Sequence, residues 1–327
     1  MQDFPRTQKL TEIINNYFRQ VEGIIGIAIC DKDGFIMASK FKEGDSEETD
    51  SIIGAISAVI DSYIDRIKNE FGTQGNFFNI TTTGDKKFAY CSQGPLSILT
   101  TVAAQNTSDI ELKVYSEHVS GKIELILDGK EEVSTDIPEI IKALAKTRAG
   151  TFTSLKGDYT NKVILTGDYK VGKTSLIKRY VENIFKEDYV STIGVQVSKK
   201  KVSLSNDTNM NFVLWDIGGQ NFQMSPYRAR FYNGADAAFI VVDRSRENNL
   251  TSVGKWYNDI KNSIPKKIPI VIVGNKSDLT DQIVITEAEI KEIARQFGFH
   301  YILTSAKTGE NVNDAFLYIA YRVIESL

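Results

Sequence analysis

The sequence is poor in the residues that build disulfide frameworks and metal centres. Among its 327 residues are two cysteines and two histidines. Cys30 and Cys91 form no ligand pattern, and so few cysteines are typical of a reducing compartment. We interpret both as small buried residues rather than a redox pair, and His118 and His300 as structural. The first half shows no arrangement of Ser, His, Asp or Cys that indicates a second catalytic centre.

Long apolar runs and lipid signals are also missing. No run reaches the roughly 18 residues that a membrane-spanning helix needs. The N-terminus has no signal-peptide core, Gln2 stands where myristoylation requires glycine, and the last residues include no cysteine to prenylate. We therefore expect a cytoplasmic protein with no direct lipid anchor, reaching a membrane only through partners. The net charge of −3, with both signs interspersed, argues against nucleic-acid binding.

The chain is long enough for two domains, and its patterning changes near residue 161. We predict a first domain over residues 1–127 and a second over residues 161–327. Residues 128–160 are expected to connect them, with a short helix over 136–146. The Gly-, Thr- and Ser-rich residues 149–160 indicate a looser link.

The second half alternates short apolar runs with helical patterns. This alternation predicts an α/β domain with a mostly parallel six-stranded sheet and helices on both faces. In such folds ligands bind at the carboxyl ends of the strands. The apolar runs lie at 162–165, 211–215, 237–242, 269–273 and 301–303, and the helical patterns at 174–180, 250–262, 287–297 and 312–324.

The first half is organised as an α+β domain. An apolar helical stripe over residues 10–21 precedes two strands, 24–30 and 35–40, joined at the Asp33-Gly34 turn. A long helix is predicted over 46–71, followed by strand-like segments at 77–83, 87–91 and 96–103 and a helix from about Asp109. This order predicts an antiparallel five-stranded sheet sandwiched by helices. The apolar stripe of the long helix is wide enough for a second packing surface, although a well-buried core helix would look similar.

One segment of the second half has the spacing of a phosphate-binding loop. The sequence Gly167-Asp168-Tyr169-Lys170-Val171-Gly172-Lys173-Thr174 follows a predicted strand and opens a predicted helix. Backbone N–H groups in such a loop, together with the helix N-terminus, bind phosphate oxygens. Lys173 would reach the β- and γ-phosphates, and the Thr174 hydroxyl would bind Mg²⁺. Alone, the pattern also fits a chance match or an ATPase, but the strand–loop–helix context favours a nucleotide site.

Three later segments follow the ends of predicted strands in a fixed order. They are Asp216-Ile217-Gly218-Gly219-Gln220, Asn275-Lys276-Ser277-Asp278 and Ser305-Ala306-Lys307. With these motifs, residues 161–327 resemble a Ras-superfamily small GTPase, nearest the Rab branch. The Asn183-Ile184-Phe185 segment and Thr192, which stands seven residues after Phe185, are similar to the family's first switch.

The resemblance implies a role for each matching residue. Gln220 would orient the attacking water, and Lys173, Thr192 and Gly219 would complete the catalytic set around the γ-phosphate. Mg²⁺ would be held by Thr174, Thr192 and Asp216. The remaining matches would bind GTP or GDP: Gly167, Asp168, Tyr169, Lys170, Val171, Gly172, Lys173, Thr174, Ser175, Phe185, Thr192, Gly219, Asn275, Lys276, Asp278, Ser305, Ala306 and Lys307. Asp278 would accept hydrogen bonds from guanine that adenine cannot donate, and this explains the base preference.

The sequence departs from the Rab pattern in two places. Trp215 and Gly218 make the second switch more similar to that of Arf proteins. Tyr169 and Lys170 occupy positions that are glycine in Ras, and the bulk of Tyr169 would obstruct an arginine supplied by a partner. No arginine in cis is recognisable, so we expect slow intrinsic hydrolysis.

Residues 6–125 resemble a roadblock (dynein light chain/bacterial polarity regulator) domain. The resemblance rests on the segment 21–28, the Asp33-Gly34 turn and the element order. These motifs are degenerate, so a longin, profilin-like or ligand-sensing domain remains an alternative. Roadblock domains typically dimerise and serve as platforms for small GTPases, which implies a homodimer and a module for docking partners.

Three functional hypotheses follow from these resemblances. The first is a GTP-binding molecular switch that hydrolyses GTP slowly and offers its two switch segments to effector or regulator proteins. The second is a nucleotide-locked scaffold, in which the nucleotide is structural and the first domain carries the function. The third is an adenine-nucleotide enzyme. Intact Lys173, Thr192, Asp216 and Gln220 argue for the first.

Overall fold

The computed structural model describes residues 4–31, 33–42, 77–130, 132–146, 157–187, 192, 194–205, 208–219, 225–247 and 249–326. It divides into two compact units, the first formed mainly by residues 1–137 and the second mainly by residues 148–327. The long helix expected over residues 46–71 and the glutamine Gln220 both lie outside the described residues. No helix among those described is long and apolar enough to span a membrane.

The first unit contains the predicted five-stranded antiparallel sheet. Its strands are β1 (Ile24–Cys30), β2 (Ile36–Phe41), β3 (Phe77–Thr83), β4 (Lys86–Ser92) and β5 (Ile98–Ala104). They are ordered β2-β1-β5-β4-β3. The all-apolar β1 lies next to the almost fully buried β5 at the centre, and the more polar β2 and β3 form the edges.

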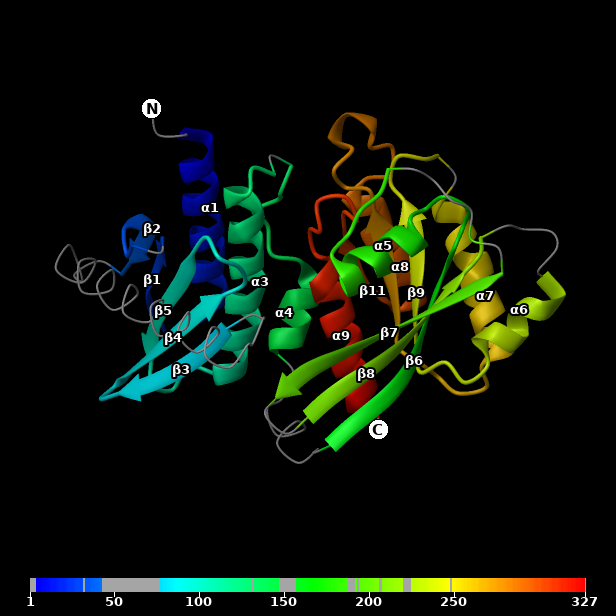
Figure 1. Ribbon diagram of the computed structural model, residues 1–327, viewed down its shortest axis with the longest axis horizontal. Helices are drawn as coiled ribbons and strands as arrows, with labels where there is room; N and C mark the ends of the chain where they lie inside the picture. Colours follow the sequence, from blue (N-terminus) through cyan, green and yellow to red (C-terminus); the bar gives the residue numbers. More distant parts are fainter. Residues whose placement is uncertain are drawn as a thin grey trace. The chain divides into compact units, whose positions relative to one another are not determined.

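Helices α1 (Phe4–Gln20) and α3 (Asp109–Leu127) pack against this sheet and against each other (Figure 1). The stripe predicted from the sequence points inward, because Leu10, Ile13, Ile14 and Tyr17 are all buried. Tyr17 stacks on Tyr115 of α3 with ring centroids 5.7 Å apart. Cys30 and Cys91 are both buried, as the sequence indicated. A short helix, α4 (Glu139–Ala145), follows within the segment expected to be helical.

The second unit contains the predicted six-stranded, mostly parallel sheet. Its strands are β6 (Gly157–Gly167), β7 (Val195–Ser205), β8 (Thr208–Ile217), β9 (Ala237–Asp243), β10 (Ile270–Asn275) and β11 (His300–Leu303). The order is β11-β10-β9-β6-β8-β7, with only the edge strand β7 antiparallel to its neighbour. The α/β fold class inferred from the sequence is therefore confirmed.

Helices cover both faces of this sheet (Figure 1). On one face, Tyr180 of α5 (Lys173–Glu182) stacks on Phe316 of α9 (Val312–Glu325), with ring centroids 3.8 Å apart, and Phe316 also meets Phe239 of β9. On the other face, one apolar core joins α6 (Ser225–Tyr232), α7 (Val253–Ser263) and α8 (Glu287–Phe297) to the strands. Short 3₁₀ turns, η2 (Leu250–Ser252) and η3 (Thr280–Gln282), precede α7 and α8.

Two segments differ from the sequence-based prediction. Strand β7 has no apolar run to mark it, because it is an edge strand with Lys199, Lys200 and Lys201 at its middle. Strand β6 begins at Gly157, inside the segment expected to be a loose link, and its first residues pair with β8 from Thr208 onward. Backbone pairing, rather than apolar side chains, extends the strand here, since β6 is mostly exposed over its first four residues.

The strand order brings the ends of four strands together. In register, Leu165 of β6 pairs with Asp216 of β8, Gly167 pairs with Val241 of β9, and Asp243 at the end of β9 pairs with Asn275 at the end of β10. The segments that follow β6, β8 and β10 therefore emerge together at the carboxyl ends of the strands, as expected for a ligand site in this fold class.

Candidate functional site

The loop between β6 and α5 is shaped by backbone conformations that favour glycine. Gly167 has φ 137° and Gly172 has φ 99°, while Lys170 is held at φ 64°. The Lys170 conformation is one that side chains rarely adopt, in keeping with its place in a slot that is glycine in Ras. The Lys173 ammonium donates to the carbonyl oxygens of Gly167 (2.9 Å) and Asp168 (2.8 Å) and so closes the loop.

Three oxygen-bearing side chains from different segments meet beside this loop. The Thr174 hydroxyl donates to Asp216 Oδ2 (2.5 Å) and lies 2.7 Å from the hydroxyl of Thr192, which also donates to Asp216 Oδ2 (3.2 Å). Burial raises the pKa of Asp216, and hydrogen bonds from Thr174 and the nearby Lys173 charge oppose that shift. The buried Asp216 Oδ1 receives no hydrogen bond from any described residue. A carboxylate with an unused oxygen beside hydroxyl groups is a donor set that suits Mg²⁺.

The segment after β8 approaches the phosphate loop so closely that it has no room for side chains. A Cβ on Gly219 would lie 2.6 Å from the carbonyl oxygen of Asp168 and 2.7 Å from the backbone nitrogen of Tyr169. A Cβ on Gly218 would lie 2.7 Å from the carbonyl oxygen of Thr192. The backbone of this segment therefore lies against both the phosphate loop and Thr192.

Asn275 ties three loops together at the other end of the site. Its amide nitrogen donates to the carbonyl oxygen of Val171 (2.9 Å). Its amide oxygen accepts from the Thr304 hydroxyl (3.2 Å) and from the backbone N–H of Ala306 (3.2 Å). With 1% of its surface exposed, Asn275 fixes the relative positions of the phosphate loop and the loop after β11.

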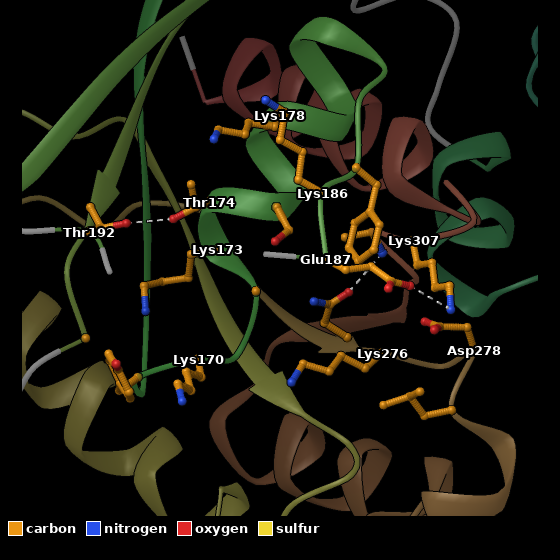
Figure 2. Close-up of a pocket in the computed structure, with 18 of the residues that line it drawn as sticks. Lys170, Lys173, Thr174, Lys178, Lys186, Glu187, Thr192, Lys276, Asp278 and Lys307 are labelled. Atoms are coloured by element: carbon orange, nitrogen blue, oxygen red, sulfur yellow. Dashed lines mark hydrogen bonds and ion pairs between the residues drawn. The ribbon is translucent and has the colours of Figure 1, made fainter. Parts of the chain in front are cut away.

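Neighbouring polar residues complete this end. Asp278 accepts from the Ser305 hydroxyl (2.6 Å), which orients its carboxylate. Lys276 has φ 66°, and its ammonium donates to Asp243 Oδ2 (2.6 Å). Lys307 forms an exposed ion pair with Glu187 (3.5 Å). Figure 2 shows this pair beside Asp278.

All of these segments line one pocket of about 660 Å³. Figure 2 shows Thr174 and Thr192 meeting at one end and Lys276, Asp278 and Lys307 at the other, with Lys170 and Lys173 along the side between them. A volume of this size, basic along its length and carrying a carboxylate at one end, suits a nucleotide with its phosphates toward the two threonines.

Residues 162–325 match the sequence model of the Ras family. The chain belongs to the Ras family. Members of this family bind GTP and GDP together with Mg²⁺ and act as switches that regulators and effectors recognise. The nucleotide and metal expected from the sequence are thus those of the family.

The Ras-family pocket brings together most of the residues expected to bind nucleotide. On its lining are Tyr169, Lys170, Gly172, Lys173, Thr174, Ser175, Phe185, Thr192, Gly219, Asn275, Lys276, Asp278, Ala306 and Lys307. Gly167, Asp168, Val171 and Ser305 are not on the lining. The Asp168 carboxylate accepts instead from Trp256 Nε1 (3.0 Å) and Asn249 Nδ2 (3.2 Å), so its side chain anchors the loop from outside the pocket.

Sequence reasoning missed several residues of this Ras-family site. Arg179 of α5 donates to the carbonyl oxygens of Ala306 (2.9 Å) and Lys307 (2.5 Å) and to Asn183 Oδ1 (3.0 Å). Burial lowers the pKa of Arg179. Lys178, Lys186, Glu187 and Arg246 also line the pocket, and Asp243 lies directly behind it. The only sequence signal for Asp243 is a polar residue at the end of an apolar run.

Proposed function

We propose that this protein is a cytoplasmic GTP-binding switch that hydrolyses GTP slowly, with an N-terminal roadblock-like module for dimerisation or partner docking. The observation that carries the proposal is the meeting of Thr192 with Thr174 and Asp216 at the phosphate end of the pocket. Thr192 stands three residues before the start of β7. A phosphate or metal ion bound by these three residues would therefore hold the segment before β7 at the phosphate end of the pocket. Loss of the γ-phosphate would release Thr192 and so change the surface offered to partners.

The phosphate chemistry falls to a small set of groups. Lys173, closed over the loop in this structure, would turn to the β- and γ-phosphates, and the Gly219 N–H would donate to the γ-phosphate. Thr174, Thr192 and Asp216 would hold Mg²⁺, which when bound neutralises charge on the phosphate oxygens. Gln220 would orient the attacking water.

The base end would select guanine. Asp278, held by the Ser305 hydroxyl, would accept from N1 and the 2-amino group. The Ala306 N–H, which donates to Asn275 Oδ1 in this structure (3.2 Å), would turn to O6. Adenine has no such donors and would leave the carboxylate unpaired at a cost of roughly 1–3 kcal/mol. ATP is therefore expected to compete poorly with GTP.

Single-turnover hydrolysis of GTP by the full chain tests the proposal. Because water orientation is a transition-state effect, Gln220→Leu is expected to slow wild-type hydrolysis by at least about tenfold while leaving GDP affinity nearly unchanged. A matched Gln296→Leu change, on the exposed surface of α8, should have no effect on the rate.

Two outcomes would contradict the proposal in different ways. Equal rates near zero for wild type and Gln220→Leu would favour the nucleotide-locked scaffold. Effective displacement of GTP by equimolar ATP would instead favour an adenine-nucleotide enzyme.

A further inference from the structure

Asp243 is a buried carboxylate behind the pocket that none of the four motifs contains. It ends β9, pairs in register with Asn275 at the end of β10, and has 0% of its surface exposed. Burying an ionised carboxylate is costly unless charged or hydrogen-bonding partners compensate it. The partners of Asp243 therefore indicate what the charge does.

Each oxygen of the carboxylate is held by a different group. Oδ1 accepts from the backbone N–H (3.0 Å) and the hydroxyl (2.7 Å) of Ser245, which fix the orientation of the carboxylate. Oδ2 accepts from the Lys276 ammonium at 2.6 Å and lies 3.4 Å from Arg246 Nε. Two cations from different loops thus share one buried oxygen.

One of these cations belongs to the base end of the pocket. Lys276 lines the pocket, and its backbone is in the left-handed region at φ 66°. A lysine side chain on its own samples many rotamers and would lose that freedom when a ligand binds. The ion pair with Asp243 removes the freedom beforehand and holds the ammonium beside the place for the base.

The other cation belongs to the phosphate end. Arg246 Nη1 donates to the carbonyl oxygen of Tyr169 in the phosphate loop (2.7 Å). The same β9–α7 segment contacts the loop a second time, where Asn249 Nδ2 donates to the Asp168 carboxylate (3.2 Å) while Asn249 Oδ1 accepts from the Asp243 N–H (3.1 Å). Asp243 is therefore joined through Arg246 and through Asn249 to the loop that would cradle the phosphates.

We propose that Asp243 is a positioning residue for nucleotide binding, which holds Lys276 for the base and, through Arg246, the phosphate loop for the phosphates. This inference rests on the proposed binding of guanine nucleotides. It adds the segment after β9 to the site and couples the two ends of the pocket through one carboxylate.

The test is the dissociation rate of fluorescent mant-GDP from the full chain in the presence of Mg²⁺. Asp243→Asn and Lys276→Gln are each expected to speed dissociation by about tenfold, because each removes a charge-assisted hydrogen bond that organises the site. If Asp243 acts by holding Lys276, the double variant should dissociate GDP hardly faster than the faster single variant. Multiplying effects, or a wild-type rate for Asp243→Asn, would overturn the inference.

The chain offers a matched control at the opposite end of the same strand. Asp236 immediately precedes β9, accepts from the Lys162 N–H (2.9 Å) and pairs with Lys266 (2.7 Å). Asp236→Asn makes the same chemical change beside another lysine and should leave mant-GDP dissociation within about twofold of wild type. An equal acceleration by Asp236→Asn would mean that loss of any strand-end carboxylate loosens the domain, and would overturn the inference.

A second nucleotide separates positioning from general damage to the loop. IDP lacks the 2-amino group that Asp278 would accept from, so the ratio of mant-IDP to mant-GDP dissociation rates measures whether Asp278 is still in place. Displacing Lys276 alone should leave that ratio unchanged in Asp243→Asn. A collapse of the ratio toward one would show that Asp243 merely holds the whole loop together.

Two further results keep this test distinct from that of the proposed function. A wild-type chain that binds no mant-GDP would refute the proposed function itself, whereas binding by wild type that Asp243→Asn leaves unchanged refutes only the inference. Should Asp243→Asn show no melting transition, Ser245→Ala removes one donor to Oδ1 and keeps the charge. We expect it to speed dissociation by about threefold, and a wild-type rate would count against the positioning role.

Discussion

At the scale of single residues, Gly219 is required because the phosphate loop leaves no room for a side chain at this position. Other glycines of the site, such as Gly172, are required by their positive φ, which the phosphate-loop spacing already implies. The close approach of Gly219 to the Asp168–Tyr169 peptide depends on how two separate loops fold against each other. The need for glycine at position 219 therefore follows from the structure and not from the sequence pattern.

Gly219→Ala should displace the phosphate loop or the segment after β8. The added Cβ would lie 2.6 Å from the Asp168 carbonyl oxygen, a distance that only movement of one backbone can relieve. Because displacements of about 1 Å can cost about a hundredfold in rate, we expect single-turnover GTP hydrolysis to fall by at least about tenfold. A time course of single-turnover GTP hydrolysis by the full chain gives the rate.

The control for this change is Gly254→Ala in α7. Its Cβ would lie 3.5 Å from the Phe297 ring, an ordinary contact, and alanine favours helix by about 0.5–1 kcal/mol over glycine. Gly254→Ala should therefore hydrolyse GTP at the wild-type rate and melt at a slightly higher temperature. Wild-type hydrolysis by Gly219→Ala would contradict the crowding argument.

The sequence predicted the site residues that act through local spacing and missed those that act across the fold. Lys173 and Thr174 follow from the loop pattern, and Asp278 follows from a short motif at a strand end. Asp243 and Arg246 belong to no such motif, and their importance arises from contacts with Lys276 and Tyr169 that are remote in sequence. A single sequence carries no signal for such pairs.

At the scale of elements, α8 is the helix that its sequence delimits best. Thr286 accepts from the Glu289 N–H (3.3 Å), the Glu289 carboxylate accepts from the Thr286 N–H (2.8 Å), and Gly298 ends the helix at φ 69°. The predicted range of 287–297 is confirmed because both ends carry local signals. Strand β7 had no such signal, because its lysines leave it without an apolar run.

Thr286→Ala should destabilise the second unit by about 1 kcal/mol at neutral pH, because the cap of α8 is lost. The backbone N–H and the hydroxyl of Thr286 both hold the pKa of Glu289 below its usual value, and alanine removes the hydroxyl's part of this effect. A carboxylate with a lowered folded-state pKa stabilises the fold above its ordinary value of about 4.5 and loses that contribution as the pH falls through the lowered pKa.

Urea unfolding at pH 7 and at pH 3 measures this effect. The difference between wild type and Thr286→Ala should be full at pH 7 and smaller at pH 3. Lys291→Ala, a mid-helix change at an exposed position of α8, should show little difference at either pH. A difference for Thr286→Ala that grows toward low pH would contradict the assignment of the cap.

At the scale of the whole molecule, the first unit is expected to bring two chains together. We predict that the full chain is a dimer in solution and that residues 157–327 alone are a monomer. The fragment begins at Gly157 because β6 begins there and its first residues pair with β8. Light scattering gives both masses, and comparing hydrolysis rates shows whether the first unit affects the second.

Identical oligomeric states for the two chains would remove the dimerisation proposal, and identical hydrolysis rates would remove autoregulation.

The five-stranded sheet of the first unit was predictable from alternating strands and turns. Its roadblock-like role stays a prediction, because the helix expected over 46–71 lies outside the described residues.

Arg179 of α5 contacts two segments that lie beside the pocket. Arg179 holds the carbonyl oxygens of Ala306 and Lys307, beside the place for the base, and also Asn183, where the first switch segment begins. The loop after β11 and the start of the first switch segment are thus held by the same guanidinium. We expect that a protein which pulls one of these segments away from α5 breaks contacts of Arg179 and so weakens its hold on the other segment.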